Sequence, residues 1–580
     1  MNFVFFSPYT LMWNTTLVEK SLKANLDTDE NKIFVINCNK DLIDHCMCFN
    51  ASGLRLDASK KEKNQICNRC NSYKKVLRKN FDKNFFDLED LLSKNDTAII
   101  EKLVQNINFE NYESFKFLDV PIGKIALHDL ILIKKLSDLK KIKKYWNFYI
   151  NILRTSLKCL LAFKNFSKLN KIDFVISPNN LYSHHQVVAK YAMKVGIIPY
   201  SLGSNALFPS KKLQYLKLLK NITGGFSYNA LNKWNDIEFK LTKDEIDFVM
   251  SYLESNFLGK HYLNFSKAKK KNNNFLKEKL NGYKKIVGVI LSGAEEDYCL
   301  IKSDVNIEYL PKKKIFKNQL DWINNLFIYI KENKNILFIF RLHPRDLKDD
   351  NNEHTQNYHN LVNALERFDS KNIIIDKPEK NVSIYEYLDV VDILLTYGST
   401  TFVDFSLLGV PIVDSDLNKL QYPHNTEFDY LESNGYFEKI NYALTQKRKF
   451  EISEKYFRWF VWTNFFDTLN ISEQINKTET KNFTNIIYKS LSRFFEKIGI
   501  FTFKLNELKK LNIRSKYKIN VLNNLFKNEN NSLIDININK IYKKKDFNIK
   551  QSNIKHINYA FREFGKKYIN KNSKFYDLFD

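Results

Sequence analysis

Residues 335–423 hold the stretch that decides the fold, because three apolar runs alternate there with polar segments. The runs are Ile336-Leu337-Phe338-Ile339-Phe340, Val391-Asp392-Ile393-Leu394-Leu395 and Pro411-Ile412-Val413. Short apolar runs separated by helix-length segments are typical of buried parallel strands in an α/β sheet. Ligands of such sheets bind beyond the carboxyl ends of the strands. The sequence therefore predicts a ligand site where these runs end.

Polar residues follow the first two runs directly. Gly398-Ser399-Thr400 follows the second run and is predicted to open a helix. A residue without a side chain lets the backbone approach a ligand, and the free N–H groups of a helix start favour anions. Arg341 ends the first run and could form paired hydrogen bonds to phosphate, while His343 could donate one more. Together these residues predict a site for a diphosphate group.

Asp404 lies early in the helix that follows this loop. Its carboxylate could accept hydrogen bonds from ribose hydroxyls. Alternatively, it stabilises the N-terminal region of the helix, a gain of about 0.3–1 kcal/mol. Both interpretations stay open from the sequence.

A second α/β unit is predicted nearer the N-terminus. Residues 2–7 and 32–37 are predicted strands with a helix over 13–24 between them, an order that predicts a parallel sheet with a right-handed crossover. A further strand over 172–177 leads into a helix over 187–195, which Gly196 ends. This half is therefore also Rossmann-like.

The polar run Lys267-Ala268-Lys269-Lys270-Lys271-Asn272-Asn273-Asn274 predicts a linker between the two halves. Before it, Thr242-Lys243-Asp244-Glu245 is a capping box that opens a helix. The predicted fold class is α/β, with two Rossmann-like domains facing a cleft and a helical C-terminal extension. The predicted boundaries are 1–265 for the first domain with its helical insertion, 266–284 for the linker, 285–449 for the second domain and 450–580 for the extension.

The extension begins with a dense aromatic segment. Packing back across both domains is the favoured interpretation of this density, and membrane contact is the alternative. Residues 505–580 are rich in Lys and Asn with weak periodicity, which suits a loose helical tail or a peripheral membrane anchor. The aromatic residues are Tyr456, Phe457, Trp459, Phe460, Trp462, Phe465 and Phe466.

The formal net charge is +26, and Gly is only 15 of 580 residues. This composition resembles that of proteins encoded by low-GC genomes, in which Lys is frequent throughout. The positive charge is therefore attributed to solvated Lys side chains in preference to binding of an anionic membrane or a polyanionic substrate. No run approaches the roughly 18 apolar residues that span a bilayer. The first residues lack the basic region of a signal peptide. A cytoplasmic location is expected, where the protein could also contact the inner face of the membrane peripherally.

Seven cysteines in a chain without an export signal indicate reduced thiols. Cys46, Cys48, Cys67 and Cys70 could form a structural zinc site, although only the second pair has the usual C-x2-C spacing. The alternative is a set of buried or incidental free thiols.

The strings RLHPRD (341–346) and YGSTTFVDFSLLGVPIV (397–413) resemble the donor-domain motifs of capsule-polysaccharide-type glycosyltransferases with the GT-B fold. Segments 173–180, 319–322 and 383–388 support the resemblance, which covers roughly residues 1–430 and is strongest over 285–425. It implies transfer of a sugar from a nucleotide-sugar to a surface glycan, or a lipid-linked glycan, without a metal or another cofactor. Arg341, His343, Gly398, Ser399, Thr400 and Asp404 would bind the donor.

The sequence also departs from the family pattern. Asp404 stands where these enzymes often have Glu, and segment 13–19 lacks an expected His. The general base is therefore left open. Candidates that could remove the acceptor proton are Glu295, Glu296 and Asp297 from the second domain, and Glu19, His184 and His185 from the first.

Two other functions remain as alternatives. A polyol-phosphate transferase of the CDP-glycerol type could use a similar phosphate site, and an anionic product would suit the positive charge. A basic nucleic-acid-binding protein is disfavoured, because Lys is spread along the chain and interrupted by acidic residues rather than concentrated with stacking aromatics.

Overall fold

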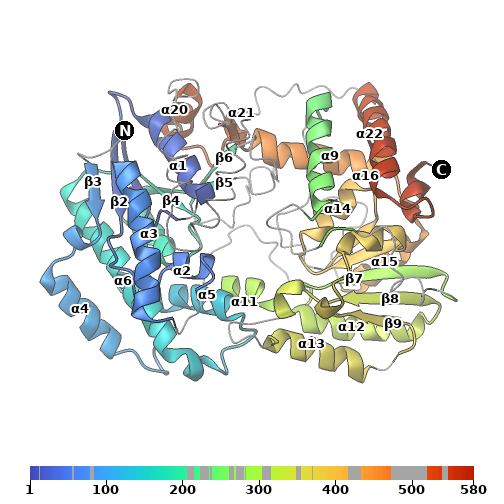
Figure 1. Cartoon of the computed structure of the whole chain (residues 1–580), viewed down its shortest axis with the longest axis horizontal. Helices are drawn as coiled ribbons and strands as arrows, with labels where there is room; N and C mark the ends of the chain where they lie inside the picture. The colour runs from blue at the N-terminus through green and yellow to red at the C-terminus, as the bar shows by residue number, and fades with distance from the viewer. Residues whose placement is uncertain are drawn as a thin grey trace.

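The computed structural model places two α/β domains side by side, one in the left half of Figure 1 and one in the right half. The first sheet lies in the N-terminal half of the chain and the second begins at Lys285. The structure describes residues 1–11, 13–54, 58–78, 84–204, 215–221, 234, 238–259, 267–269, 280, 282–303, 315–347, 354–368, 370–415, 433–471, 519–537 and 547–579.

The first domain is built on a sheet with the strand order β12-β6-β5-β4-β1-β2-β3. Strands β1 to β5 pair in parallel, whereas β6 and β12 pair antiparallel to their neighbours. The central strands are apolar throughout because helices cover both faces of a parallel sheet. The strands are β1 (Asn2–Phe6), β2 (Lys32–Asn37), β3 (Phe85–Asp87), β4 (Phe174–Pro178), β5 (Ile198–Ser204), β6 (Tyr215–Lys220) and β12 (Leu469–Asn470).

Helices of the first domain include the predicted crossover and an insertion between β2 and β4. The helix predicted from Val187 begins earlier, at Ser183, because the buried Asp129 carboxylate accepts hydrogen bonds from the Ser183 backbone N–H and hydroxyl. The helices are α1 (Trp13–Leu26), α2 (Met47–Ala51), α3 (Lys60–Arg78), α4 (Lys94–Gln105), α5 (Ile122–Lys134), α6 (Trp146–Leu169) and α7 (Ser183–Lys194).

The second domain has a five-stranded parallel sheet with the order β11-β10-β7-β8-β9. If β7 to β11 are numbered 1 to 5 along the chain, this order is 5-4-1-2-3. Strands β1 to β5 of the first domain follow the same order, which is that of the Rossmann fold. The fold is therefore GT-B-like, as the resemblance implies. The strands are β7 (Lys285–Ile290), β8 (Ile336–Arg341), β9 (Ile373–Asp376), β10 (Ile393–Thr396) and β11 (Ile412–Asp414).

Helices cover both faces of the second sheet. The longest of them, α12, begins where Asn318 accepts a hydrogen bond from the backbone of Asp321. The helices and single turns are α11 (Ala294–Lys302), α12 (Gln319–Glu332), η4 (Pro344–Leu347), α13 (Gln356–Arg367), η6 (Ile384–Asp389), α14 (Thr401–Leu407) and α15 (Ser433–Thr445).

Helix α9 (Lys243–Phe257) begins with the predicted capping box, in which Thr242 and Glu245 bond to each other's backbone. Although α9 precedes the expected linker, its apolar residues belong to the core of the second domain. Of the linker, the structure describes 267–269, 280 and 282–284. Lys269 there pairs with Asp389 at 2.6 Å.

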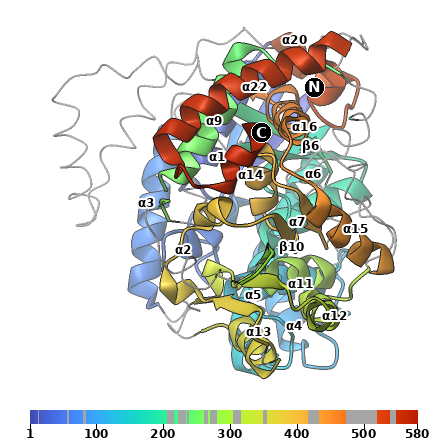
Figure 2. The same cartoon turned by 90° about the vertical axis from the view of Figure 1, so that its right-hand side faces the viewer.

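The C-terminal extension packs on both domains, which confirms the interpretation of its aromatic segment. Helix α16 (Phe450–Val461) lies against α9 and α14, and β12 after it joins the first sheet. Helix α20 (Ile519–Lys527) packs on α1, whereas α22 (Phe547–Tyr568) lies across α9 and α16 in Figure 2. The prediction of a loose tail is wrong for the described part, because Phe526 and Phe561 fill the cores.

No helix within the described ranges combines the length and the apolar character that crossing a bilayer requires.

Candidate functional site

The carboxyl ends of β7 and β10 are neighbours at the point where the strand order of the second sheet reverses. The Ser292 hydroxyl after β7 donates to the carbonyl of Tyr397 after β10 at 2.7 Å. Gln319 accepts from the Ser292 N–H at 2.7 Å and donates to its carbonyl at 3.0 Å. These bonds fix the two loops relative to each other at the position where Rossmann sheets bind ligands.

The loop after β10 carries the predicted phosphate-binding residues. Gly398 has a φ of +56°, a conformation that favours glycine, and its N–H donates to Asp414 at 3.0 Å. Ser399 is half-buried and Thr400 is exposed at the start of α14. The loop therefore keeps hydroxyls at the surface, and its role in nucleotide binding stays a prediction.

Arg341 lies at the end of β8 with its guanidinium engaged inside the second domain. It pairs with Asp376 at 2.5 Å and donates to the carbonyl of Val382 at 2.8 Å. The Tyr387 hydroxyl donates to the same Asp376 oxygen at 2.9 Å. These contacts join the ends of β8 and β9 to η6. The proposed phosphate contact of Arg341 stays a prediction, and it would have to be made in addition to them.

Asp404 lies on α14 with its side chain buried against α9 and η6. Its two carboxylate oxygens accept hydrogen bonds from Tyr252 at 2.6 Å and Tyr385 at 2.7 Å. Burial raises its pKa to about 6, against the lowering effect of these hydrogen bonds. The carboxylate thus links α14 to α9 and η6, a role that neither sequence interpretation included. Binding of ribose stays a prediction.

The second arginine of the RLHPRD string is directed toward the acidic start of α11. Arg345 pairs with Glu295 at 3.2 Å and also with Glu296. Its backbone N–H donates to Nδ1 of His343 at 3.2 Å. Burial raises the pKa of Glu295 more than Arg345 lowers it. The structure thus brings His343, Glu295 and Glu296 together around Arg345, while the side chain of Asp297 lies outside the described residues.

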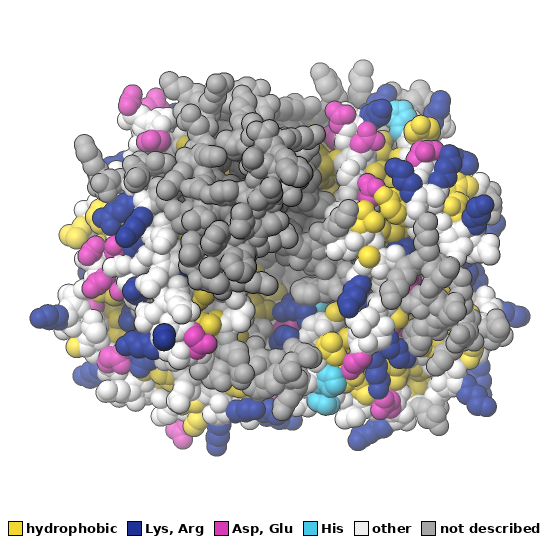
Figure 3. Space-filling model, in the orientation of Figure 1, with side chains coloured by type: hydrophobic (Ala, Val, Ile, Leu, Met, Phe, Trp, Pro, Cys, Tyr) yellow, Lys and Arg dark blue, Asp and Glu magenta, His cyan; other side chains and the backbone are white. Residues whose placement is uncertain are grey.

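This acidic group lies where the two domains touch. Helix α11 packs against α5 of the first domain, with Cys299 against His128. Lys135, at the end of α5, donates to the carbonyl of Arg345 at 2.6 Å. Lys302 pairs with Glu113 at 3.2 Å across the same contact. Figure 3 shows Lys or Arg, acidic and His side chains at the bottom of a hollow between the two halves of the molecule.

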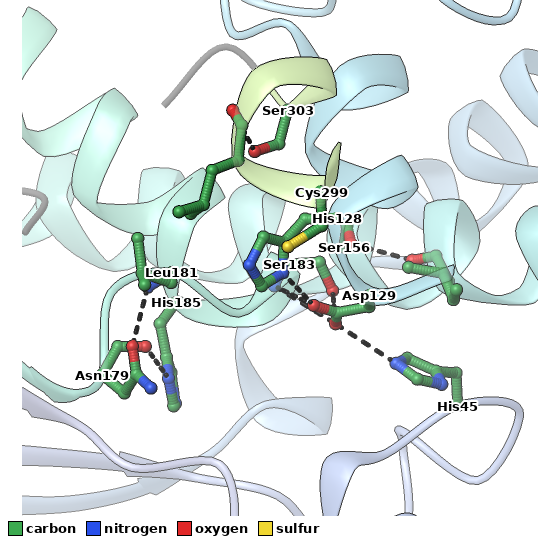
Figure 4. Close-up of polar contacts among 12 residues, drawn as sticks. His45, His128, Asp129, Ser156, Asn179, Leu181, Ser183, His185, Cys299 and Ser303 are labelled. Atoms are coloured by element: carbon green, nitrogen blue, oxygen red, sulfur yellow. Dashed lines mark hydrogen bonds and ion pairs between the residues drawn. The ribbon is translucent and has the colours of Figure 1, made fainter. Parts of the chain in front are cut away.

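On the first-domain side, a buried cluster of titratable residues surrounds Asp129 (Figure 4). The carboxylate contacts His128 at 3.0 Å and His45 at 3.4 Å, and the Ser183 hydroxyl donates to it at 2.6 Å. Burial acts to raise the pKa of Asp129, but the hydrogen bonds with His128 and His45 outweigh it and hold the pKa well below its usual range.

His128 carries the matching positive charge. Burial acts to lower its pKa, yet the neighbouring Cys299 and the bond to Asp129 raise it to about 10. Asp129 and His128 therefore form a buried ion pair at neutral pH. The pair connects α5 with the first turn of α7 and with α11 of the other domain.

His184 and His185 lie in the first turn of α7, and both are fully buried. His185 Nδ1 lies 3.2 Å from the Asn179 carbonyl, which can only accept, so Nδ1 carries the proton and Nε2 a lone pair. Nε2 has no hydrogen-bond partner among the described residues. Burial lowers the pKa of His185 to about 4 and that of His184 well below its usual value. Both imidazoles are therefore neutral.

The sequence did not reveal Asp129, His128 and His45. Its one local signal was a His-Asp pair inside the otherwise apolar segment 125–133, where buried charges need partners. Glu19, a predicted base candidate, instead forms a buried ion pair with Lys23 on α1.

Cys46, Cys48, Cys67 and Cys70 come together around one small hollow. Within the part of the chain that the structure describes, no group of three or more His, Cys, Asp or Glu side chains is placed to hold a metal ion. The zinc site stays a prediction.

No protein-family model and no curated protein matches the sequence. Solved structures that it resembles include a UDP-GlcNAc 2-epimerase from Methanocaldococcus jannaschii (12% identity, 77% of this chain and 94% of that one, TM-score 0.26). Others are a Candida albicans trehalose-6-phosphate phosphatase N-terminal domain (12%, 80% and 95%, TM-score 0.30) and a Neisseria meningitidis UDP-GlcNAc 2-epimerase (9%, 88% and 98%, TM-score 0.22). At such TM-scores the likeness carries no inference, and the fold assignment rests on the sheet topology.

Proposed function

We propose that this chain is a glycosyltransferase that moves a sugar from a nucleotide-sugar to a surface-polysaccharide acceptor. The observation that supports it most is the contact between α5 and α11, which brings acidic and histidine residues of two Rossmann-like domains together. In such folds ligands bind at the carboxyl ends of the strands where the strand order reverses. Each domain offers one such position. The second domain binds the donor and the first domain binds the acceptor.

The donor nucleotide binds to the second domain in this proposal. Its diphosphate lies against Ser399 and Thr400, at the backbone that Gly398 turns. Positive charge comes from Arg345, which exchanges its pairing with the Glu295 and Glu296 carboxylates for the donor phosphate. A guanidinium suits this exchange, because it forms paired bonds with carboxylate and phosphate alike.

Glu295 is the proposed general base. Its buried carboxylate has a raised pKa, which brings it closer to the pH at which proton transfer is efficient. The acceptor hydroxyl oxygen forms a bond to the anomeric carbon, and the bond from that carbon to the diphosphate breaks. The hydroxyl proton passes to Glu295 and the nucleoside diphosphate leaves.

Thermal unfolding in the presence of UDP, GDP, ADP, CDP or CMP tests the donor site. One nucleotide should stabilise the protein, by about 2.7 kcal/mol at a hundred times its Kd. Thr400→Glu should abolish the stabilisation, because the new carboxylate repels the diphosphate. Thr97→Glu, at an exposed threonine in the first turn of α4, is the control. Stabilisation that survives Thr400→Glu would place the nucleotide elsewhere, and stabilisation by CDP or CMP alone would favour polyol-phosphate transfer.

Glu295→Gln tests the base. Turnover should fall by about 10²–10⁴-fold with nucleotide affinity retained. Glu332→Gln on the exposed end of α12 is the control and should keep full turnover. Full turnover in Glu295→Gln would exclude this residue and direct attention to His185.

A further inference from the structure

The hollow beside the end of β1 takes no part in the proposed transfer, yet five thiols line it. Cys48 and Cys70 are buried there, and Cys38, Cys46 and Cys67 are half-buried. Cys48 lies on α2 and Cys70 on α3, and both pack in a small core with Tyr9 and Ile133. Two helices from different parts of the insertion thus bring their sulfur atoms together.

Hydrogen-bond donors converge on one of these sulfurs. The Thr10 N–H donates to Cys70 Sγ at 3.2 Å, and the Leu11 N–H donates to it as well. The Thr10 hydroxyl donates to the Cys70 carbonyl at 2.7 Å and lies 3.3 Å from the same sulfur. The Cys48 thiol is a further hydrogen-bond partner of Cys70. Donors of this kind stabilise a thiolate, which is the form that attacks oxidants.

We propose that Cys70 and Cys48 are a peroxide-reactive thiol pair that closes to a disulfide. The Cys70 thiolate attacks one oxygen of a peroxide, the O–O bond breaks, and the leaving oxygen takes up a proton and departs as water or an alcohol. Cys70 becomes a sulfenic acid. The Cys48 sulfur then attacks the Cys70 sulfur, the S–O bond breaks and water leaves with the thiol proton. The peroxide is reduced by two electrons and the thiol pair is oxidised by two.

The geometry assigns different roles to the two cysteines. Cys70 has the backbone donors, so it reacts first. Cys48 is 2% exposed and contacts Cys70 from the opposite helix, so it resolves the sulfenic acid. Cys159 in α6 provides an internal reference, because it is fully buried in the core of the same domain and does not line the hollow.

The test uses the full chain, reduced and then exposed to hydrogen peroxide before acid quenching and peptide mass spectrometry. A Cys48–Cys70 cross-linked peptide should form before any oxidation of Cys159, and dithiothreitol should remove it. In Cys48→Ser the cross-link should be lost and dimedone should label Cys70. Thr10→Val keeps both thiols and the backbone N–H, and it should slow cross-linking. This variant tests the proposal even if a cysteine variant fails to fold.

Other outcomes would overturn the proposal. A cross-link of Cys70 to Cys46 or Cys67, or oxidation no faster than that of Cys159, would contradict the assigned pair. Stoichiometric zinc released from the purified protein by a thiol reagent would identify the thiols as metal ligands instead. Each result is independent of whether the chain transfers sugars.

Discussion

A buried aspartate from each domain, Asp129 and Asp404, can be compared directly, because their pKa values move in opposite directions. Asp129 in the first domain contacts two histidines, and its pKa is held well below the usual range despite burial. Asp404 in the second domain contacts two tyrosine hydroxyls, and burial raises its pKa to about 6. The charge of the partner decides the result, because a neutral donor does not offset the loss of hydration.

The two carboxylates therefore contribute to stability with opposite pH dependence. Asp129 stabilises the fold above its unfolded pKa, and this contribution is lost as the pH falls through its folded pKa. His128 contributes below its unfolded pKa and loses its contribution as the pH rises through about 10. Asp404 has a raised folded pKa, so the stability of the protein falls as the pH rises from about 3.8 to about 6, and the loss is complete above that.

Asp129→Asn should give the largest effect. It leaves His128 as an uncompensated buried cation, which costs about 3–5 kcal/mol of unfolding free energy at neutral pH. Urea unfolding measures it. Asp119→Asn is the control, since Asp119 pairs with Lys194 on the exposed surface, where an ion pair contributes little to stability. Equal effects would show that the Asp129 cluster carries no net ionic interaction.

Arg341→Ala should come next, because it leaves Asp376 buried without its cation. We expect a loss of up to about 3–5 kcal/mol in unfolding free energy. If Arg341 also binds the donor phosphate, nucleotide affinity in the folded variant should fall by about 1.5–3 kcal/mol. Calorimetric titration of the folded variant separates the two roles, and unchanged affinity would remove Arg341 from the donor site.

Asp404→Asn should act in the reverse direction. The amide removes a carboxylate that is costly to ionise, so stability at neutral pH should rise by up to about 3 kcal/mol. The fall in wild-type stability between pH values near 3.8 and about 6 should also disappear. Denaturant unfolding across this pH range is the measurement. A variant that is less stable at neutral pH and keeps the same slope would contradict the pKa assignment.

Ser292→Ala should give the smallest effect. It removes the hydrogen bond to the Tyr397 carbonyl and should cost about 1 kcal/mol. Because this bond joins the loops after β7 and β10, nucleotide affinity should weaken along with stability. Ser303→Ala removes a comparable buried hydroxyl whose bond to the Leu300 carbonyl is longer, 3.4 Å, and should leave nucleotide affinity unchanged.

The sequence predicted features that depend on neighbouring residues. The ends of β8 and β10 and the capping box at Thr242 are local signals, and the structure contains each of them. The Asp129 cluster was missed because its partners His45 and Ser183 are 84 and 54 residues away in sequence. Likewise, nothing near Arg341 in the sequence identified Asp376 as its partner.

The packing of the C-terminal extension has a consequence for biosynthesis. Phe526 completes the core beneath the first sheet, and Phe561 contributes to the core of the second. Domains usually fold as units during synthesis, the N-terminal one first. Here neither core is complete until the ribosome has translated residues 519–579, so a nascent first domain exposes the apolar surface that α20 later covers. Chaperone protection during translation is therefore expected to matter more for this chain than for proteins whose domains are each continuous in sequence.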